Sequence, residues 1–278
     1  MAAGGLRCNV RGIDVTLHRG GRGAPLLYLH SASAEGGLWG APFAQLAERY
    51  DVLVPVHPGF PGSDGLERIH HVTDVVLHYV DLLDTLRFGQ AHVVGSSLGG
   101  WIAAELASLY PERVGSLVLC GAAGLWIAGA PIAEVFGVLP GQLAERLFHD
   151  QQHPMAQLLH AAGDTEFGPL PPEEAVIAFH QANEATARVA WNPYFHNPAL
   201  AHRLDRIAVP TLVLWGAEDR VIPRAHAERY RACIRGAELR TIAACGHLPA
   251  IEQPQAFADH VLDFLAAHPL NLATAGGA

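Results

Sequence analysis

The chain has 278 residues, of which 50% are hydrophobic and 16% are charged, so it can bury a large core and is not a disordered protein. Its formal net charge of −9, from 18 basic and 27 acidic residues, argues against a nucleic-acid-binding surface. All the basic residues are arginine. The absence of lysine from the sequence excludes a Schiff-base or P-loop mechanism.

The predicted elements begin with an antiparallel hairpin in residues 7–23, where alternating residues are interrupted by glycine-containing turns. Short apolar runs then alternate with amphipathic helical stretches. Runs that are apolar on both faces predict a parallel sheet covered by helices. These predicted strands are residues 25–29, 52–56, 91–94, 117–120, 211–215 and 239–242.

Four helices are predicted between the strands from their apolar spacing. They span residues 72–88, 100–109, 225–234 and 255–267. Thr73 or Asp74 is a candidate cap for the first, and Pro111 ends the second. Alternation of strand and helix predicts an α/β fold whose ligands bind outside the carboxyl ends of the strands.

Residues 122–205 interrupt this alternation with helical stretches and no convincing strand. The helical stretches are residues 141–148, 155–162 and 172–190. We therefore predict a core domain of residues 1–121 and 206–278, with a helical lobe of residues 122–205 inserted between two strands.

Residues 114–133 carry no charge over the length of a membrane span, but glycines and Pro131 favour a buried strand that runs into a loop. The four cysteines form no C-x-x-C pair and predict reduced thiols rather than disulfides. The N-terminus has no apolar signal-peptide region. These features predict a cytoplasmic protein without membrane or nucleic-acid partners, either a monomer or a homodimer.

The pattern Gly95-Ser96-Ser97-Leu98-Gly99 fits G-x-S-x-G and lies between a predicted strand and a predicted helix. That context places Ser97 on a sharp turn as a candidate nucleophile. Asp219 follows the next-to-last predicted strand, with Glu218 as the neighbouring alternative, and His247 lies in the loop after the last one. The chain order Ser, Asp, His fits the catalytic triad of an acyl-transfer enzyme.

The segments LLYLHSASAEGGLW, VPVHPGFPGSD, VVGSSLGG, LVLWGAEDRVIP and GHLPAIEQP together resemble the α/β-hydrolase superfamily, specifically its capped esterase, lactonase and C–C hydrolase branch. The resemblance implies an α/β-hydrolase fold: a mostly parallel central sheet with helices on both faces and an inserted helical cap. It assigns the catalytic roles to Ser97, Asp219 and His247. It also implies an oxyanion hole made by the backbone N–H groups of Ala32 and Leu98, with no cofactor.

Four positions depart from the family pattern. Ser31 stands where a glycine usually follows the loop histidine His30, and His57 stands where aspartate is frequent. C–C bond hydrolases of this family usually have asparagine before the nucleophile and tryptophan after the base, but this chain has Ser96 and Leu248. Ser96 and Leu248 favour ester or lactone hydrolysis.

Aromatic residues of the predicted cap, including Trp126 and Trp191, are candidates for an apolar roof over Ser97, with the cap's own core as the alternative role. His30, Ser31 and Leu248 would complete the substrate site. No metal site is predicted, since H-E-x-x-H is absent and the pair His149 and His153, four residues apart, is followed immediately by Pro154.

We therefore expect a cofactor-free serine hydrolase that cleaves a small-molecule carboxylic ester or lactone through an acyl-enzyme. One alternative is a C–C bond hydrolase of diketone-like acids, for which Arg188 is the candidate to bind the substrate carboxylate. The other alternative is a non-enzymatic receptor for a small molecule on the same fold.

Overall fold

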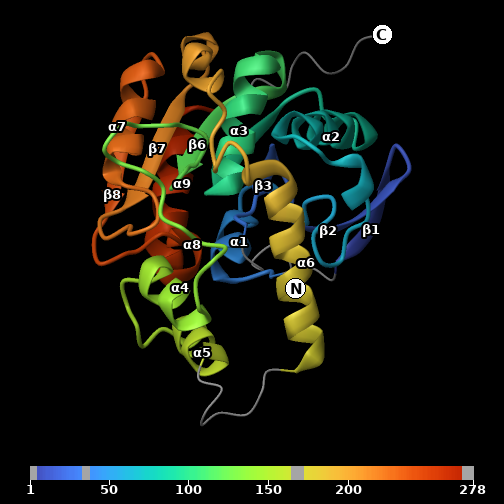
Figure 1. The fold of residues 1–278 in the computed structure, drawn as a ribbon. Helices are drawn as coiled ribbons and strands as arrows, with labels where there is room; N and C mark the ends of the chain where they lie inside the picture. Colours follow the sequence, from blue (N-terminus) through green and yellow to red (C-terminus); the bar gives the residue numbers. More distant parts are fainter. Residues whose placement is uncertain (1–4, 33–37, 164–171, 271–278) are drawn as a thin grey trace.

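The computed structural model describes residues 5–32, 38–163 and 172–270. Their eight-stranded sheet has the order β1-β2-β4-β3-β5-β6-β7-β8 (Figure 1). The strands are β1 (Leu6–Val10), β2 (Ile13–Gly21), β3 (Pro25–Leu29), β4 (Asp51–Pro55), β5 (Ala91–Ser96), β6 (Val114–Cys120), β7 (Thr211–Gly216) and β8 (Glu238–Ile242). The hairpin β1–β2 joins β4 in antiparallel pairing, and β4 to β8 are parallel with β3 among them.

The predicted fold class is confirmed. Strands β3, β4, β5 and β7 are buried along their whole length, because their residues are apolar on both faces and helices cover both sides of the sheet. Each of the six predicted parallel strands overlaps one of β3 to β8. The chain leaves β3 for β4 on one side and returns to β5 on the other, so the strand order reverses there. Ligand sites of open α/β sheets form at such reversals.

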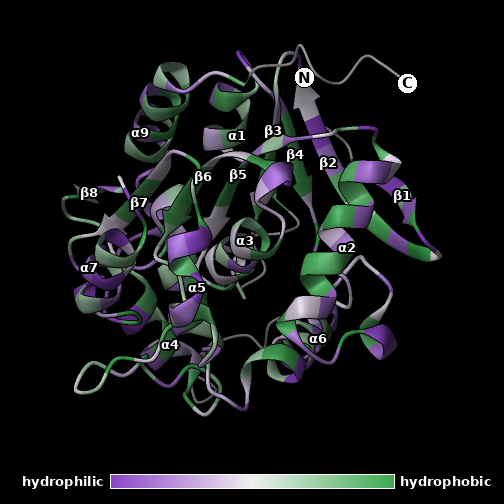
Figure 2. Ribbon diagram, turned by 90° about the horizontal axis from the view of Figure 1, so that it is seen from above, coloured by the Kyte–Doolittle hydropathy of each residue, from purple (hydrophilic) through white to green (hydrophobic). Residues whose placement is uncertain are grey.

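Two apolar clusters pack against opposite faces of the sheet. One includes residues of α2 (Val72–Thr85), α3 (Leu98–Leu109) and α7 (Arg224–Cys233), and the other includes residues of α1 (Ala41–Leu46) and α9 (Pro254–Ala267). Figure 2 shows mainly hydrophobic central strands and hydrophilic residues on α7. The sequence did not predict α1 or the four-residue α8 (Pro249–Glu252), because both are too short for a helical apolar period.

The first predicted helix cap is corrected by the structure. The N-cap of α2 is His71 rather than Thr73 or Asp74. Asp74 instead lies in the first turn, where its carboxylate accepts the backbone N–H groups of His70 and His71. Negative charge in this position is favourable because it lies at the positive end of the helix dipole.

Residues 122–205, called here the inserted segment, connect β6 to β7 and extend from one end of the sheet (Figure 1). They contain α4 (Pro140–Leu147), α5 (Pro154–Gly163), α6 (Glu173–Ala190) and the short 3₁₀ helix η4 (Leu200–His202). The remaining 3₁₀ helices are η2 (Leu66–Arg68), η3 (Pro111–Arg113) and η5 (Leu204–Arg206). The helical character predicted for the inserted segment agrees with these elements, whereas its role as a separate cap remains a prediction.

A fully buried carboxylate, Glu105 of α3, ties the returning end of the inserted segment to the core. It accepts hydrogen bonds from Trp101 Nε1 at 3.2 Å, Asn197 Nδ2 at 2.7 Å and Arg203 Nη2 at 2.5 Å. A buried charge is tolerated only with such partners, and removal of one partner costs about 3–5 kcal/mol. Glu105 therefore anchors this end of the inserted segment to α3.

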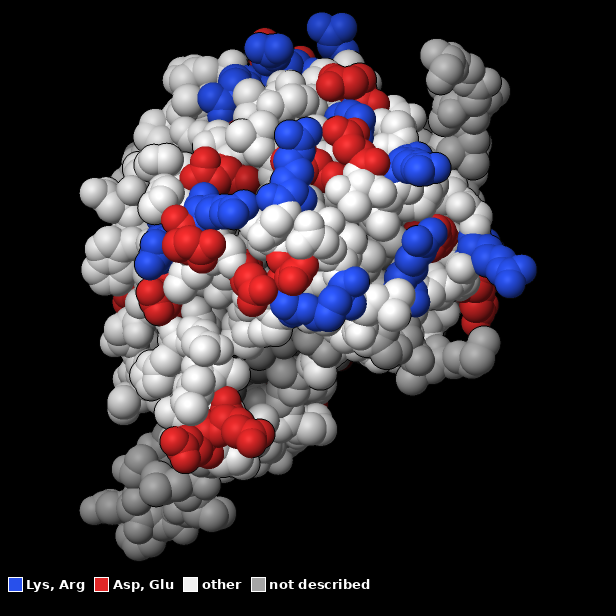
Figure 3. Space-filling model, turned by 90° about the vertical axis from the view of Figure 1, so that its right-hand side faces the viewer, with Lys and Arg blue, Asp and Glu red and all other residues white. Residues whose placement is uncertain are grey.

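Within the described ranges, no helix is both long enough and apolar enough to cross a bilayer. The uncharged stretch 114–133 starts as the buried strand β6 and continues as a loop, as predicted. On the face shown in Figure 3, arginine and acidic side chains are interspersed rather than gathered into a basic patch.

Candidate active site

Ser97 lies on the sharp turn between β5 and α3, of which it is the N-cap. Its backbone has φ 53° and ψ −112°, a left-handed conformation that is costly for a residue with a side chain. Glycines make the turn possible. A Cβ atom on Gly95 would lie 2.2 Å from the Gly99 carbonyl oxygen, and one on Gly99 would lie 2.0 Å from the Leu29 carbonyl oxygen. The structure thus holds the Ser97 hydroxyl at the N-terminus of α3.

His247 and Asp219 complete a hydrogen-bonded chain with Ser97. His247 Nε2 lies 2.8 Å from Ser97 Oγ, and His247 Nδ1 lies 2.8 Å from Asp219 Oδ2. The second carboxylate oxygen of Asp219 accepts the backbone N–H groups of Val221 and Ile222, both at 2.9 Å. Because Asp219 can only accept at Oδ2, the histidine donates from Nδ1 and presents Nε2 to the serine as an acceptor.

The structure distinguishes between the two candidate carboxylates. Glu218 is exposed, whereas the side chain of Asp219 is 1% exposed and that of His247 is 3% exposed. The three residues that hydrogen-bond each come from a loop after a different parallel strand: β5, β7 and β8. This is the arrangement that the sequence predicted for Ser97, Asp219 and His247.

The two residues expected to form the oxyanion hole follow neighbouring strands. Leu98 is the first residue of α3 and is buried, and Ala32 lies in the bend after β3 and is half-buried. The N-terminus of α3 carries free N–H groups and a positive partial charge, which suit a developing oxyanion. Their roles remain predictions.

His30 and His57 form a buried network beside this loop. His57 donates its backbone N–H to His30 Nε2 at 2.9 Å, and its own Nε2 lies 2.8 Å from the His30 carbonyl oxygen. His30 Nδ1 lies 2.6 Å from the Ser31 carbonyl oxygen, and His57 Nδ1 hydrogen-bonds the Tyr79 hydroxyl. Burial lowers the pKa of His30 to about 4 despite its bond to the Ser31 carbonyl. This network was not predicted, because Tyr79 lies in α2, remote in sequence from the loop.

The remaining predicted site residues have different surroundings. Leu248 directly follows His247 and is buried in the core. Trp126 is 63% exposed beside His196, and Trp191 is 61% exposed with its ring against Phe136. Neither tryptophan is core, so the alternative that they form the interior of the inserted segment is wrong. Their role as a roof over Ser97 remains a prediction.

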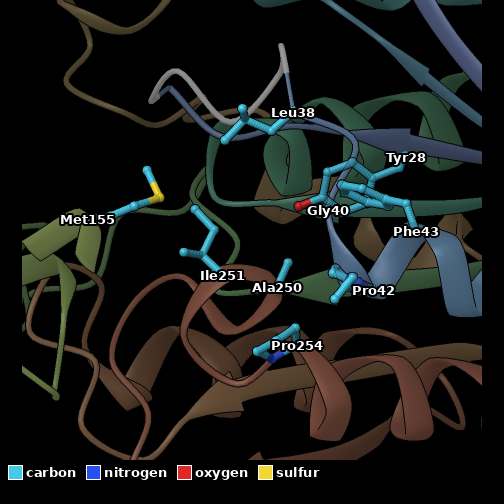
Figure 4. A pocket seen from close by; sticks show the side chains of 10 residues that line it. Tyr28, Leu38, Gly40, Pro42, Phe43, Met155, Ala250, Ile251 and Pro254 are labelled. Atoms are coloured by element: carbon cyan, nitrogen blue, oxygen red, sulfur yellow. The ribbon is translucent and has the colours of Figure 1, made fainter. Parts of the chain in front are cut away.

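An apolar pocket of about 250 Å³ lies beside the loop of His247 (Figure 4). Its walls come from Leu38 and the start of α1, from Ala250 and Ile251 of α8, and from Met155 of α5. The pocket is therefore lined by residues of both the core and the inserted segment, and α8 begins two residues after His247; Ser97, Asp219 and His247 are not among its lining residues.

No group of three or more potential metal ligands occurs in the described part of the chain. His153 instead stacks on Phe148 and accepts the backbone N–H of Met155. Burial, together with the charges of Glu252 and Asp219, raises the pKa of the Cys245 thiol, so Cys245 is not an activated nucleophile despite its place two residues before His247.

Comparison with known proteins relates this geometry to a family. The family model of the alpha/beta hydrolase fold matches residues 24–254. A 2-hydroxymuconate semialdehyde hydrolase from Pseudomonas sp. (strain CF600) is 32% identical over 270 residues, which cover 92% of this chain and 91% of the relative. A 2-hydroxy-6-oxo-6-phenylhexa-2,4-dienoate hydrolase from Burkholderia cepacia is 28% identical and covers 91% of each chain.

Among solved structures, a bacterial membrane phospholipase A superposes with a TM-score of 0.81 at 25% identity, covering 96% of this chain and 86% of the other. The two sequence relatives are named for hydrolysis of hydroxy-oxo acids, which matches the C–C bond alternative better than the ester prediction. The structural relative is named for a lipid-ester activity. The chain is therefore similar to hydrolases of both kinds.

Proposed function

This chain belongs to the α/β-hydrolase fold family, and we propose that it is a cofactor-free serine hydrolase of small carboxylic esters or lactones. The observation that carries the proposal is the continuous chain Ser97 Oγ, His247 Nε2, His247 Nδ1 and Asp219 Oδ2, with 2.8 Å at both hydrogen bonds. These distances lie within the range needed for proton transfer between nucleophile and base.

In the proposed mechanism, His247 Nε2 takes the hydroxyl proton of Ser97 as its Oγ attacks the substrate carbonyl carbon. The negative charge on the carbonyl oxygen is stabilised by the backbone N–H groups of Ala32 and Leu98. Asp219 keeps the imidazole in the tautomer that presents Nε2 and stabilises the imidazolium. His247 then protonates the leaving alcohol, and a water molecule, deprotonated by His247, releases the acid from the acyl-enzyme.

The apolar pocket beside α8 supports a substrate with an apolar part. We propose that it receives the acyl or aromatic portion, because the described residues that line it, among them Leu38, Met155 and Ile251, are uncharged. Trp126 and Trp191, together with His30, Ser31 and Leu248, would bind the rest of the substrate.

Cleavage of a C–C bond in a hydroxy-oxo acid is the second candidate, and the two sequence relatives favour it. It requires a cation for the substrate carboxylate. Arg188, the candidate for that role, forms an ion pair of 3.4 Å with Glu184 one turn earlier on α6. The presence of Ser96 and Leu248 supports ester cleavage instead.

A direct comparison of substrates tests the choice. We expect turnover of p-nitrophenyl esters of graded chain length, and weaker or no turnover of 2-hydroxy-6-oxo-6-phenylhexa-2,4-dienoate. The opposite ratio of kcat/KM would establish the C–C alternative, and tight binding of esters without turnover would favour a receptor. Arg188→Gln supplies the control, since it is expected to leave ester turnover unchanged but to abolish cleavage of the acid if Arg188 binds a carboxylate.

A further inference from the structure

The loop that carries His247 is attached to the inserted segment rather than to the core alone. The backbone N–H of His247 donates to the carbonyl oxygen of Leu147 at 2.8 Å. Leu147 is the last residue of α4, so the free carbonyl at the end of that helix is satisfied by the residue that bonds Ser97. A displacement of the end of α4 would therefore act directly on the backbone of His247.

A second connection runs through Glu252, the last residue of α8, which is 8% exposed. Its Oε2 accepts the backbone N–H of Gly246 at 2.5 Å, and its Oε1 accepts the backbone N–H of Asp150 at 2.6 Å. One buried carboxylate thus bridges the residue before His247 and the turn after α4. Charge-assisted hydrogen bonds of this length are among the stronger ones in proteins.

The approach of the two segments is too close for a side chain at position 246. A Cβ atom on Gly246 would lie 2.5 Å from the Leu147 carbonyl oxygen and 2.8 Å from the backbone nitrogen of His149. Gly246 does not have a positive φ, so its need for glycine comes from this contact and not from its own conformation. The absence of a side chain at Gly246 is what allows the end of α4 to reach His247.

We propose that Glu252 is a positioning residue, which holds the His247 imidazole at Ser97 by locking the histidine loop to residues 147–150 of the inserted segment. The proposal rests on the proposed function of Ser97 and His247. The imidazole must satisfy Ser97 on one nitrogen and Asp219 on the other, so its position must be fixed to a fraction of an ångström. A misplacement of about 1 Å can cost about a hundredfold in rate.

Three substitutions of buried carboxylates provide the test. Glu252→Gln keeps the shape but presents an NH₂ group to one of the two backbone donors, and Glu252→Asp keeps the charge but is too short to bridge both. We expect both variants to lower kcat about a hundredfold with KM changed less than about threefold. Glu105→Gln is the matched control, because Glu105 is also buried and also binds the inserted segment, but through Asn197 and Arg203. It is expected to lower the melting temperature and to keep kcat.

A matched pair of glycines tests the same contact from the other side. Gly246→Ala must push the end of α4 away, so we expect a loss of kcat similar to that of Glu252→Gln. Gly137→Ala lies on the same inserted segment, where a Cβ atom would meet nothing within 4 Å, and is expected to retain activity. In Glu252→Gln, Glu252→Asp and Gly246→Ala, we expect the downfield proton resonance of the His247–Asp219 hydrogen bond to shift or broaden, a change that a loss of stability alone would not produce.

The outcomes separate this inference from the proposed function. If Ser97→Ala remains active, the proposed function fails. If Ser97→Ala is inactive but Glu252→Gln keeps its kcat and its downfield resonance, only the positioning role fails. Full activity of Glu252→Asp beside an impaired Glu252→Gln would also overturn it, since charge rather than the bridge would then be what matters. An equal loss of kcat in Glu105→Gln would likewise overturn it.

Discussion

The imidazole ring of His57 stacks on that of His30, with ring centroids 3.6 Å apart and planes inclined by 29°. Hydrogen bonds assign a neutral form to both rings, because His30 Nε2 accepts the His57 N–H and His57 Nδ1 accepts the hydroxyl of Tyr79. Burial raises the pKa of Tyr79, so this hydroxyl stays protonated as a donor. A proton on either ring would place a charge against the other, in a site without water-like solvation.

This neutrality predicts a fold that weakens in mild acid. Burial lowers the pKa of His30 and of His78 to about 4, from an ordinary value of 6.5, and lowers that of His57 well below 6.5. Between these values the unfolded chain binds more protons than the folded one. Stability is therefore complete above about pH 6.5 and falls as the pH drops toward 4, by about 3 kcal/mol for one such histidine once fully developed. Urea unfolding between pH 8 and pH 4.5 measures this, and a midpoint that does not change would contradict it.

His92 allows the effect to be isolated at one residue. It is buried in β5, both of its ring nitrogens lack a hydrogen-bond partner among the described residues, and burial and His268 lower its pKa to about 4. His92→Leu removes the unpaired polar atoms and the proton site together. We expect the variant to be more stable than the parent, with a larger gain at pH 5 than at pH 8. An identical gain at both pH values would show that protonation of His92 plays no part.

The strained backbone of Ser97 predicts that activity and stability oppose each other there. Its φ of 53° costs about 1–3 kcal/mol for a residue with a side chain, whereas glycine adopts it freely and loses about 0.5–1 kcal/mol in chain entropy. Ser97→Gly is therefore expected to melt a few degrees above Ser97→Ala. Both variants should lose turnover and labelling by a fluorophosphonate. Labelling that persists, or that moves to Ser96, would refute the assignment of the nucleophile.

Asp219→Asn should lower kcat by about ten-thousandfold. The amide oxygen can still accept the N–H groups of Val221 and Ile222, which turns the NH₂ group toward His247 Nδ1 and forces the wrong tautomer. Glu218→Gln is the adjacent control at an exposed carboxylate and should be nearly neutral. Steady-state kinetics on one ester measure both variants, and the reverse order of effects would assign the acid to Glu218.

Sequence reasoning located Ser97, Asp219 and His247 because each lies in the turn or loop after a strand that an apolar run predicts, and parallel strands bring their carboxyl ends to one edge. It did not find the bridge made by Glu252, although this residue lies in the GHLPAIEQP segment. The partners of Glu252 are backbone N–H groups, and Asp150 is 102 positions away, so no side-chain pattern signals the contact. The short helix α1 was not predicted for a related reason, because six residues are too few to show the helical spacing of apolar residues. For Trp126 and Trp191, aromatic character suggested either a roof over Ser97 or the core of the inserted segment; both are largely exposed, which contradicts the second role.

Met155 provides the test of where the apolar part of the substrate binds. Its side chain lines the pocket from α5, across from Pro42 and Phe43 of α1 (Figure 4). Met155→Phe would put a bulkier, stiffer side chain into a volume of about 250 Å³, so long acyl chains should lose kcat/KM relative to short ones. One methylene in a hydrophobic pocket is worth about 1–3 kcal/mol, which corresponds to about 10–200-fold in discrimination.

Leu158→Phe is the matched control on the same helix, because Leu158 is 66% exposed and does not line the pocket. The chain-length profile of p-nitrophenyl esters should change in Met155→Phe and stay unchanged in Leu158→Phe. If both profiles match the parent, the acyl group binds elsewhere, and the exposed tryptophans of the inserted segment become the next residues to vary.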